Sequence, residues 1–333
     1  MSTTTASKRA SHDAMSMFTP KIARSSPSDE ALRRTLGSVA ALGLTDHLLE
    51  LETQGYTTVK GVLSPDRVER AKAAILRRVE RKTGRRIDPQ TAVAADFSGM
   101  QYVPYLLYDD PVFQEILLEP GPLALISYLL GESCLLSSMG CHFRGPGGMP
   151  LFVHADTNGP APYPTASMVA NCNYALTPYS REAGALAMFP GSHRLRRQPT
   201  AAENFTAPGF KLSELSAKGR EPGALDDITW IDPPGAVTMT LDPGDAVIWH
   251  GATWHGGFRR ELPGVRVNLA AYFCRPHITP QERHFDTVHQ DVLDRHANEP
   301  RFARLLGGDV FNGWREDGPD YAKAAKNPRG LFD

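Results

Sequence analysis

The sequence predicts an α+β protein that is mainly β, in which N-terminal helices support an antiparallel β-sandwich or barrel. Apolar residues at helical spacing occur mostly before Gly131. After Gly131, short apolar runs alternate with Gly, Pro and Asn, which is typical of short strands joined by turns. Because helices gather at one end of the chain and strands at the other, the simplest architecture is a helical layer that backs a β-barrel.

The predicted elements follow in chain order. Residues 54–60 read as a short strand, and Ser64 before Pro65 is a helix N-cap whose helix ends at Gly84. Residues 111–130 predict two short helices, interrupted at residues 120–122 and stopped by Gly131. Seven strands are then expected, within residues 134–143, 150–154, 167–176, 186–189, 236–241, 245–249 and 266–273.

We expect one folded domain over residues 31–333, because barrels of this length often form a single unit. Its helical support lies mostly in residues 31–131, its strand-rich core in about 132–276, and a helical tail in about 280–333. Residues 1–30 are expected to be a disordered arm, since residues 1–28 hold eleven Ser or Thr and one acid. The same composition leaves a transit peptide as the alternative to a cytoplasmic location.

Charge and composition exclude several classes of partner. The 36 Lys and Arg residues balance the 37 Asp and Glu residues. A net charge of −1 provides no excess of positive charge to bind nucleic acid or acidic membranes. No apolar run approaches the length of a membrane span. The four cysteines lack C-x-x-C spacing and are expected to be buried, reduced thiols. The class of partner that remains is a small-molecule substrate. The sequence does not determine the oligomeric state.

A candidate metal site begins with His154 and Asp156. On an extended backbone residues i and i+2 project to the same face, so both side chains can hold one ion. His255, which lies 255 − 154 = 101 residues later, can supply a third ligand just past another predicted strand. Two imidazoles and one carboxylate are the facial triad of non-haem Fe(II) oxygenases. A Zn²⁺ hydrolase could use the same three side chains.

The last predicted strand carries Arg266. Alternation places Arg266, Asn268, Ala270 and Tyr272 on one face, opposite the apolar residues 265, 267, 269, 271 and 273. A guanidinium inside a barrel needs an anion. A bound dicarboxylate and a protein Asp or Glu partner are equally good candidates from the strand alone.

These motifs together resemble the phytanoyl-CoA dioxygenase (PhyH-like) family of Fe(II)/2-oxoglutarate oxygenases. The resemblance covers roughly residues 54–283 and includes Gly55-Tyr56, the His154-Ala155-Asp156 motif, residues 184–186 and 190–193, Gly244-Asp245 and Trp254-His255-Gly256. The step of 266 − 255 = 11 residues from the distal His to Arg266 is the usual one in the family.

The resemblance implies a double-stranded β-helix (jelly-roll, cupin-like) core with His154, Asp156 and His255 as ligands of Fe(II). It further implies 2-oxoglutarate and O2 as co-substrates, with Arg266 and Asn173 contacting 2-oxoglutarate and Asn171 as a weaker candidate. His250 and His193 correspond to positions that are structural in relatives. Because Asp156 keeps the carboxylate that related halogenases lack, hydroxylation with release of succinate and CO2 is expected rather than halogenation.

Two departures from the family pattern affect the expected 2-oxoglutarate contacts. Relatives commonly carry Asn and Ser between the distal His and the Arg, where this chain has residues 258–262, and a small hydroxyl where it has Gly257. The substrate pocket is expected around Phe97, Tyr102 and Tyr105, in the segment where relatives have lid residues. An aromatic lid suits a small lipophilic metabolite, although a non-catalytic jelly-roll binding module remains an alternative.

Overall fold

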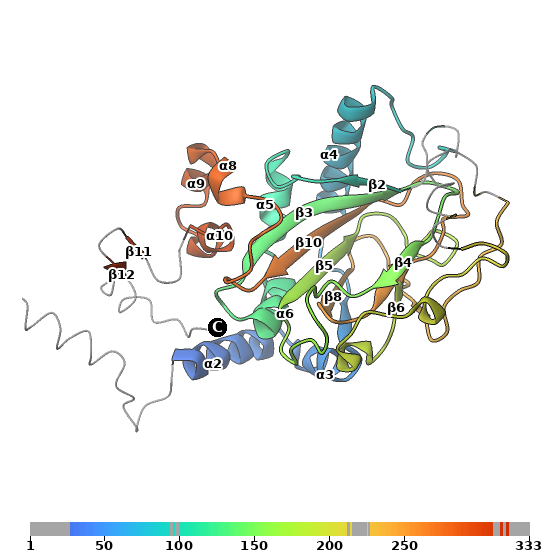
Figure 1. The fold of residues 1–333 in the computed structure, drawn as a ribbon. Coiled ribbons are helices and arrows are strands. Elements are labelled where there is room, and N and C mark those ends of the chain that lie inside the picture. Colours follow the sequence, from blue (N-terminus) through green and yellow to red (C-terminus); the bar gives the residue numbers. More distant parts are fainter. Residues whose placement is uncertain are drawn as a thin grey trace, which may run out of the picture.

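The computed structural model describes residues 27–93, 96, 100–211, 214, 225, 227–308, 314–315 and 318–319. Two antiparallel sheets face each other at its centre (Figure 1). The larger has six strands in the order β1-β8-β5-β10-β3-β2. These strands are β1 (Tyr56–Val59), β2 (Met100–Val103), β3 (Leu135–Arg144), β5 (Val169–Ala175), β8 (Ala246–His250) and β10 (Asn268–Cys274).

The smaller sheet has four strands in the order β4-β9-β6-β7. They are β4 (Leu151–His154), β6 (Leu186–Met188), β7 (Val237–Thr238) and β9 (His255–Gly257). All seven strands expected after Gly131 are present, and the double-stranded β-helix is confirmed. Two strands of these two sheets were not predicted: β2, which lies in the expected lid segment, and β9, which begins at His255.

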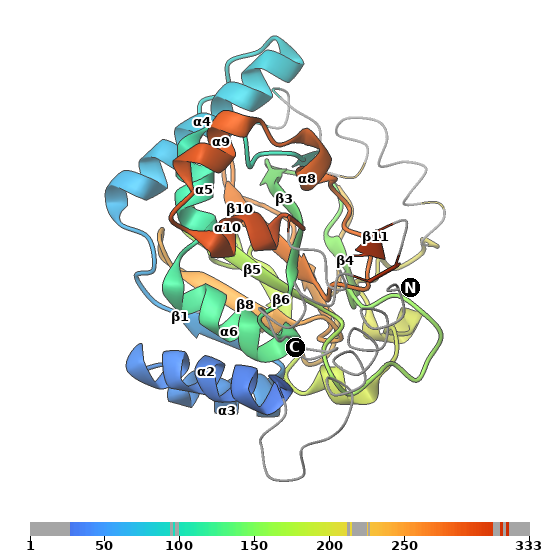
Figure 2. The same cartoon turned by 90° about the vertical axis from the view of Figure 1, so that its left-hand side faces the viewer.

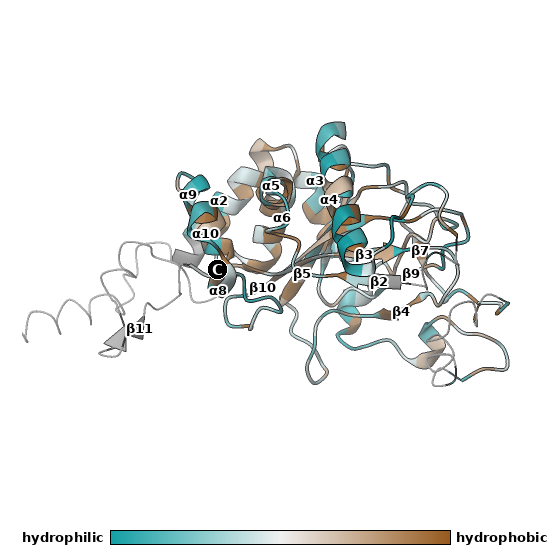
Figure 3. Cartoon of the chain, turned by 90° about the horizontal axis from the view of Figure 1, so that it is seen from above, coloured by the Kyte–Doolittle hydropathy of each residue, from teal (hydrophilic) through white to brown (hydrophobic). Residues whose placement is uncertain are grey.

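Helices cover the outer face of the larger sheet (Figure 3). In chain order they are α2 (Pro27–Ala41), α3 (Thr45–Gln54), α4 (Pro65–Thr83), α5 (Pro111–Leu117) and α6 (Pro120–Leu130). Three short helices, α8 (His284–Thr287), α9 (Gln290–Arg295) and α10 (Pro300–Leu305), lie beside α5 at one end of this sheet (Figure 2). The 3₁₀ turns η1 (Ser192–Leu195) and η2 (Ala201–Glu203) follow β6.

Local sequence signals explain where the helices begin and end. The Ser64 hydroxyl accepts a hydrogen bond from the Arg67 N–H at the start of α4, and Gly84 ends that helix at a φ of 68°. Asp110 caps α5, and Gly131 ends α6 at a φ of 90°. The expected boundaries at Ser64, Gly84 and Gly131 are therefore confirmed.

The structure differs from the predicted domain limits at both ends. Helix α2 begins at Pro27, within the arm expected over residues 1–30, whereas residues 1–26 lie outside the described part. The tail is helical from His284 to Leu305, but residues 314–319 contribute a two-stranded pairing of β11 (Trp314–Arg315) with β12 (Gly318–Pro319) instead of a helix. No helix in the described residues is long and apolar enough to cross a membrane.

Alternation along the strands divides the larger sheet into an outer apolar face and an inner polar face. Around β10, residues 265, 267, 269, 271 and 273 all join the core formed with the helices, as the sequence predicts. Buried thiols lie in or beside the same layer: Cys134, Cys141, Cys172 and Cys274 are buried and unbridged. The opposite positions, including Asn268 and Tyr272, therefore point between the two sheets.

Strand register arranges the inner face in rows. One row contains Ser138, Tyr272, Asn171 and Trp249, paired across β3, β10, β5 and β8. The next contains Gly140, Ala270, Asn173 and Val247. Beyond them lie His142 beside Asn268, and then Arg144 opposite Arg266. The space between the sheets thus has an aromatic and amide end, at Tyr272, Asn171 and Trp249, and a guanidinium end, at Arg144 and Arg266.

The Asp245 side chain connects the end of β1 to the turn before β8 through hydrogen bonds. Its buried carboxylate accepts hydrogen bonds from the Lys60 ammonium at 2.7 Å, the Gly61 N–H at 2.8 Å and the Asp242 N–H at 2.9 Å. Burial opposes ionisation, but these three donors outweigh it and hold the pKa of Asp245 below its usual 3.8.

Replacement of Asp245 by Ala is expected to lower the free energy of unfolding by about 2–3 kcal/mol, because two backbone donors lose their acceptor. Since the folded pKa is depressed, the contribution of Asp245 is present above pH 4 and is lost as pH falls through the folded pKa. Urea titrations at neutral pH and near pH 3 measure both effects. Lys60→Met is the control and should cost about 1 kcal/mol or less, because Lys60 is largely exposed. Equal costs for the two variants would contradict this role of Asp245.

Candidate metal centre

His154, Asp156 and His255 come together between the two sheets. His154 ends β4, Asp156 follows it, and His255 begins β9, where it pairs with His154. One potential ligand atom from each residue lies within 4.8 Å of the others, and the two imidazole rings are 4.4 Å apart between centroids. The chain therefore gathers the three predicted ligands at a single point.

Hydrogen bonds to the backbone fix the tautomer of both histidines. Nδ1 of His154 lies 2.8 Å from the Phe152 carbonyl oxygen, and Nδ1 of His255 lies 3.1 Å from the Thr253 carbonyl oxygen. Because a carbonyl can only accept, each Nδ1 must carry the proton, which leaves the lone pair on Nε2. Burial lowers the pKa of His255, so this ring is neutral at pH 7. Both Nε2 atoms are thus prepared to bind a cation.

Asp156 is oriented by donors from the opposite sheet. Its Oδ2 accepts from Asn171 Nδ2 at 2.9 Å and from Trp249 Nε1 at 3.0 Å. The His Nε2 atoms stay 3.6 and 3.8 Å from the carboxylate oxygens, beyond hydrogen-bond distance. A carboxylate and two bare imidazole nitrogens that converge without bonding one another fit a divalent transition metal.

Access to the three ligands is uneven. The His255 side chain is 5% exposed, whereas the His154 side chain is 40% exposed. A metal held here would therefore be covered on the His255 side and reachable on the His154 side. That asymmetry provides room for a further ligand.

Arg266 lies on the same inner face and is 2% exposed. One guanidinium nitrogen donates to the Gly184 carbonyl and another reaches the His142 carbonyl at 3.5 Å. The ring of Tyr179 lies 5.1 Å from the guanidinium carbon. No carboxylate in the described part of the chain pairs with Arg266, so the second candidate from the sequence, a protein Asp or Glu, is not found there.

Three buried polar atoms near Arg266 have no hydrogen-bond partner among the described residues: Arg266 Nε, Asn268 Nδ2 and His142 Nδ1. Burial lowers the pKa of His142 to about 3, with Arg266 and then Arg144 adding to the effect, so its ring is neutral. Buried polar groups are normally paired. The Asn268 and His142 nitrogens lie in the row between the triad and Arg266, and together with Arg266 Nε they fit a bound molecule that carries oxygen atoms.

The remaining sequence candidates have distinct surroundings. Asn171 bonds Asp156, while the Asn173 Oδ1 accepts from the Tyr179 hydroxyl at 3.3 Å. His250 lies outside the triad and has both ring nitrogens bonded to backbone atoms of residues 165 and 252. His193 lies in η1, and its ring bonds the backbone of Glu52.

The predicted pocket aromatics separate in the structure. Tyr102 lies over Gly140, where an added Cβ would meet its hydroxyl at 2.7 Å, and its ring is 4.9 Å from that of His142. Tyr105 has a φ of 58°, and its ring lies 6.3 Å from that of His284. Phe97 lies outside the described residues. Tyr102 is thus the aromatic that borders the inner face.

Sequence reasoning missed Trp249 as a partner of Asp156, and it missed Arg144 beside Arg266. Alternation along residues 245–249 could have placed Trp249 on the inner face, but it could not have shown which carboxylate the indole reaches. Arg144 is the last residue of β3, beyond the predicted strand end at Phe143. Its pairing with Arg266 depends on register between distant strands.

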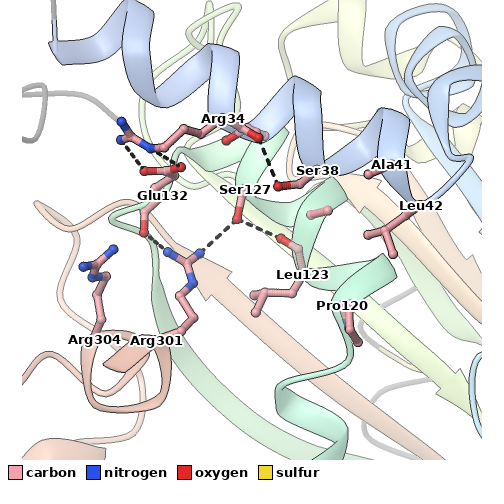
Figure 4. A pocket seen from close by; sticks show the side chains of 12 residues that line it. Arg34, Ser38, Ala41, Leu42, Pro120, Leu123, Ser127, Glu132, Arg301 and Arg304 are labelled. Atoms are coloured by element: carbon pink, nitrogen blue, oxygen red, sulfur yellow. Dashed lines mark hydrogen bonds and ion pairs between the residues drawn. The ribbon is translucent and has the colours of Figure 1, made fainter. Parts of the chain in front are cut away.

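A separate cavity of about 580 Å³ lies between α2, α6 and α10 (Figure 4). Arg34 donates to the Glu132 carboxylate on its edge, and Arg301 donates to the Ser127 hydroxyl at 2.9 Å. The lining residues contain one acid and no histidine or cysteine. This cavity therefore lacks the ligand set of the metal centre.

Comparisons with known proteins identify the family of the chain and several relatives. The sequence profile of the phytanoyl-CoA dioxygenase (PhyH) family matches residues 51–266. The chain is 27% identical to dioxygenase af480 of Aspergillus fumigatus over 248 residues, covering 72% of this chain and 69% of that protein. It is 29% identical to dioxygenase FrzG of a Cladobotryum species over 128 residues, but this match covers only 35% of FrzG. The crystal structure of HygX from Streptomyces hygroscopicus, with nickel and 2-oxoglutarate bound, superposes with a TM-score of 0.50 at 16% identity, over 71% of this chain and 88% of that one.

Trp249→Phe is expected to weaken metal binding by about 10–100-fold, because Asp156 loses one of the two donors that orient it. Anaerobic titration with Fe(II) or Mn(II) measures the dissociation constant. Trp254→Phe is the matched control, since its indole N–H donates to the Arg197 carbonyl instead of to a ligand. Equal metal affinity in both variants would remove Trp249 from the site.

Proposed function

Because the chain belongs to the phytanoyl-CoA dioxygenase family, we propose that it is an Fe(II)- and 2-oxoglutarate-dependent dioxygenase. Its reaction is the hydroxylation, or another oxidation, of an unactivated C–H bond in a small lipophilic metabolite, with release of succinate and CO2. The observation that carries the proposal is the joint presence of the triad and a buried Arg266 that has no carboxylate partner in the described residues.

In this proposal His154, Asp156 and His255 hold the iron. When bound, Fe(II) supplies the activation of O2 that C–H oxidation requires. The protein keeps each Nδ1 proton on a backbone carbonyl, so both imidazoles remain neutral donors. Asn171 and Trp249 hold the Asp156 carboxylate in place through its Oδ2 atom.

Arg266 would bind the 5-carboxylate of 2-oxoglutarate. A guanidinium–carboxylate pair in a buried site is short and directional. The Asn268 Nδ2 and His142 Nδ1 atoms, which have no hydrogen-bond partner among the described residues, lie in the row next to Arg266 and would offer polar contacts to the co-substrate. Asn173 lies one row nearer the metal and is a further candidate.

The carboxylate of Asp156 favours hydroxylation over halogenation. A halide needs a coordination position that this side chain occupies. Iron and 2-oxoglutarate, rather than Zn²⁺, are favoured because a hydrolase has no use for a buried guanidinium 11 residues beyond the distal ligand. A non-catalytic jelly-roll module would not need the complete triad.

An anaerobic visible spectrum tests the cofactors. Protein with Fe(II) and 2-oxoglutarate is expected to give a charge-transfer band that requires both, and Asp156→Ala is expected to abolish it. His250→Ala should keep the band, because both of its ring nitrogens face the backbone. Absence of the band in the unaltered protein, together with bound Zn²⁺, would favour the hydrolase instead.

Arg266→Ala is expected to raise the KM for 2-oxoglutarate by the equivalent of about 2–5 kcal/mol, because the 5-carboxylate is left buried without its partner. Succinate release at varied 2-oxoglutarate concentration measures the change. An unchanged KM would mean that the dicarboxylate binds elsewhere.

A further inference from the structure

Strand β4, which ends in the ligand His154, lies at the edge of the smaller sheet. The order β4-β9-β6-β7 places β9 on one side of it and no strand of the described residues on the other. Alternate residues of a strand direct their backbone N–H and C=O groups to the same edge. Because His154 pairs with His255 of β9, the backbone groups of Val153 and Ala155 face the open edge. The most exposed of the three ligands therefore lies on a strand that has a neighbouring strand on one side only.

Two side-chain amides occupy this open edge in place of a strand. Gln198 Oε1 accepts a hydrogen bond from the Ala155 N–H at 2.8 Å, and Gln198 Nε2 donates to the Ala155 carbonyl at 2.9 Å. Asn204 Oδ1 accepts from the Val153 N–H at 2.9 Å, and Asn204 Nδ2 donates to the Val153 carbonyl at 2.9 Å. An amide side chain offers the same acceptor and donor as a peptide group. Each amide thus reproduces the paired hydrogen bonds of an antiparallel neighbour.

The Gln198 amide contacts the backbone beside two metal ligands. Ala155 lies between His154 and Asp156 in the chain. Gln198 Nε2 also reaches the carbonyl oxygen of Thr157, at 3.4 Å, so one side chain bonds the residues that precede and follow Asp156. The donors described above fix the carboxylate of Asp156, whereas Gln198 fixes the backbone that carries it.

Hydrogen bonds within the segment that carries the two amides hold it in shape. Arg197 donates to the Glu203 carboxylate at 2.8 and 2.9 Å, and this carboxylate also accepts from the Thr200 N–H at 2.7 Å. The 3₁₀ turn η2 begins with this capping box and lies between Gln198 and Asn204. The earlier amide of the segment bonds the later residue of the edge, so the segment runs antiparallel to β4. The amides are therefore presented by an ordered turn.

The exposure of Gln198 separates a positioning role from a structural one. Gln198 is exposed, whereas Asn204 is half-buried. If Gln198 is replaced, water can bond the freed N–H and C=O groups of Ala155, so the stability of the fold should change little. Water cannot fix the direction of the backbone from which His154 projects. A role confined to covering an open edge against other chains would leave metal binding unchanged.

We propose that Gln198, supported by Asn204, is a positioning residue of the metal centre. Its amide fixes the backbone from which His154 and Asp156 project, and it thereby sets the affinity and the coordination geometry of the bound divalent metal. This inference rests on the proposed function, because it requires a metal ion at the triad. Groups that orient metal ligands typically change metal affinity by about 10–100-fold when they are removed, and an exposed amide belongs at or below the lower limit.

Anaerobic titration of the metal-free protein with Mn(II) and Co(II) tests the proposal. Gln198→Met keeps the length of the side chain but removes its hydrogen bonds to the backbone. This variant is expected to raise the Kd of Mn(II) by about fivefold or more and to alter the visible spectrum of bound Co(II). The Tm of the metal-free protein should stay almost unchanged. Asn204→Leu should shift the Kd in the same direction, and Gln198→Met decides the test by itself.

Gln114→Met is the matched control. The Gln114 amide also makes two hydrogen bonds, to the Leu107 carbonyl at 3.3 Å and with His296 Nε2 at 3.1 Å, but it is buried in α5 of the helical layer. Its replacement should lower the Tm, keep the Kd of Mn(II) within about twofold and leave the Co(II) spectrum unchanged, because no ligand backbone is released.

The two possible failures give different results. An unchanged Kd and Co(II) spectrum in Gln198→Met, or an equal rise of the Kd in Gln198→Met and Gln114→Met, would overturn the positioning role of Gln198. Failure of the unaltered protein to bind either Mn(II) or Co(II) would instead overturn the proposed function.

Discussion

The hydrogen bonds that Asp156 accepts from Asn171 and Trp249 are the constraint on which the site depends. The two histidines belong to the smaller sheet, whereas both donors belong to the larger one. The carboxylate therefore joins the sheets at the point where the ligand atoms converge. Because interior packing resists displacement, a fixed spacing between the sheets is also a fixed ligand geometry.

The opposite end of the inner face is governed by charge. Arg144, Arg260 and Arg266 are all buried, and burial followed by the charge of Arg266 lowers the pKa of Arg260 to about 10. Backbone carbonyls accept hydrogen bonds from Nε and both terminal nitrogens of Arg260. Arg266 donates through its terminal nitrogens, but its Nε has no partner among the described residues. The buried Arg266, which pairs with no carboxylate among the described residues, is a reason for an anion to bind at this end rather than at the exposed His154 side.

The sequence was sufficient for features that depend on local pattern. Alternation in residues 266–273 and turn residues between apolar runs predicted the faces and strands, and the i, i+2 spacing brought His154 and Asp156 together. It was insufficient where long-range register decides. Strand β9 has three residues, two of them glycines, so it carries no apolar alternation. The meeting of Trp249 with Asp156 and of Arg144 with Arg266 requires the pairing of strands that are far apart in the chain.

The rows of side chains on the inner face of the larger sheet differ in charge. This difference would allow co-substrate and substrate to occupy different ends of the space between the sheets. Beside Tyr102 the inner face carries hydroxyl and amide groups, and the Ser138 hydroxyl donates to the Gln281 side chain at 2.8 Å. The nearby Glu282 carboxylate is already bonded to the N–H groups of Tyr105 and Met139. A charged keto acid is therefore drawn toward the arginines, and the neutral aromatic end beside Tyr102 is left for a molecule with little charge. This division of charge along the inner face, rather than the shape of the barrel alone, is the support for the lipophilic substrate that we propose.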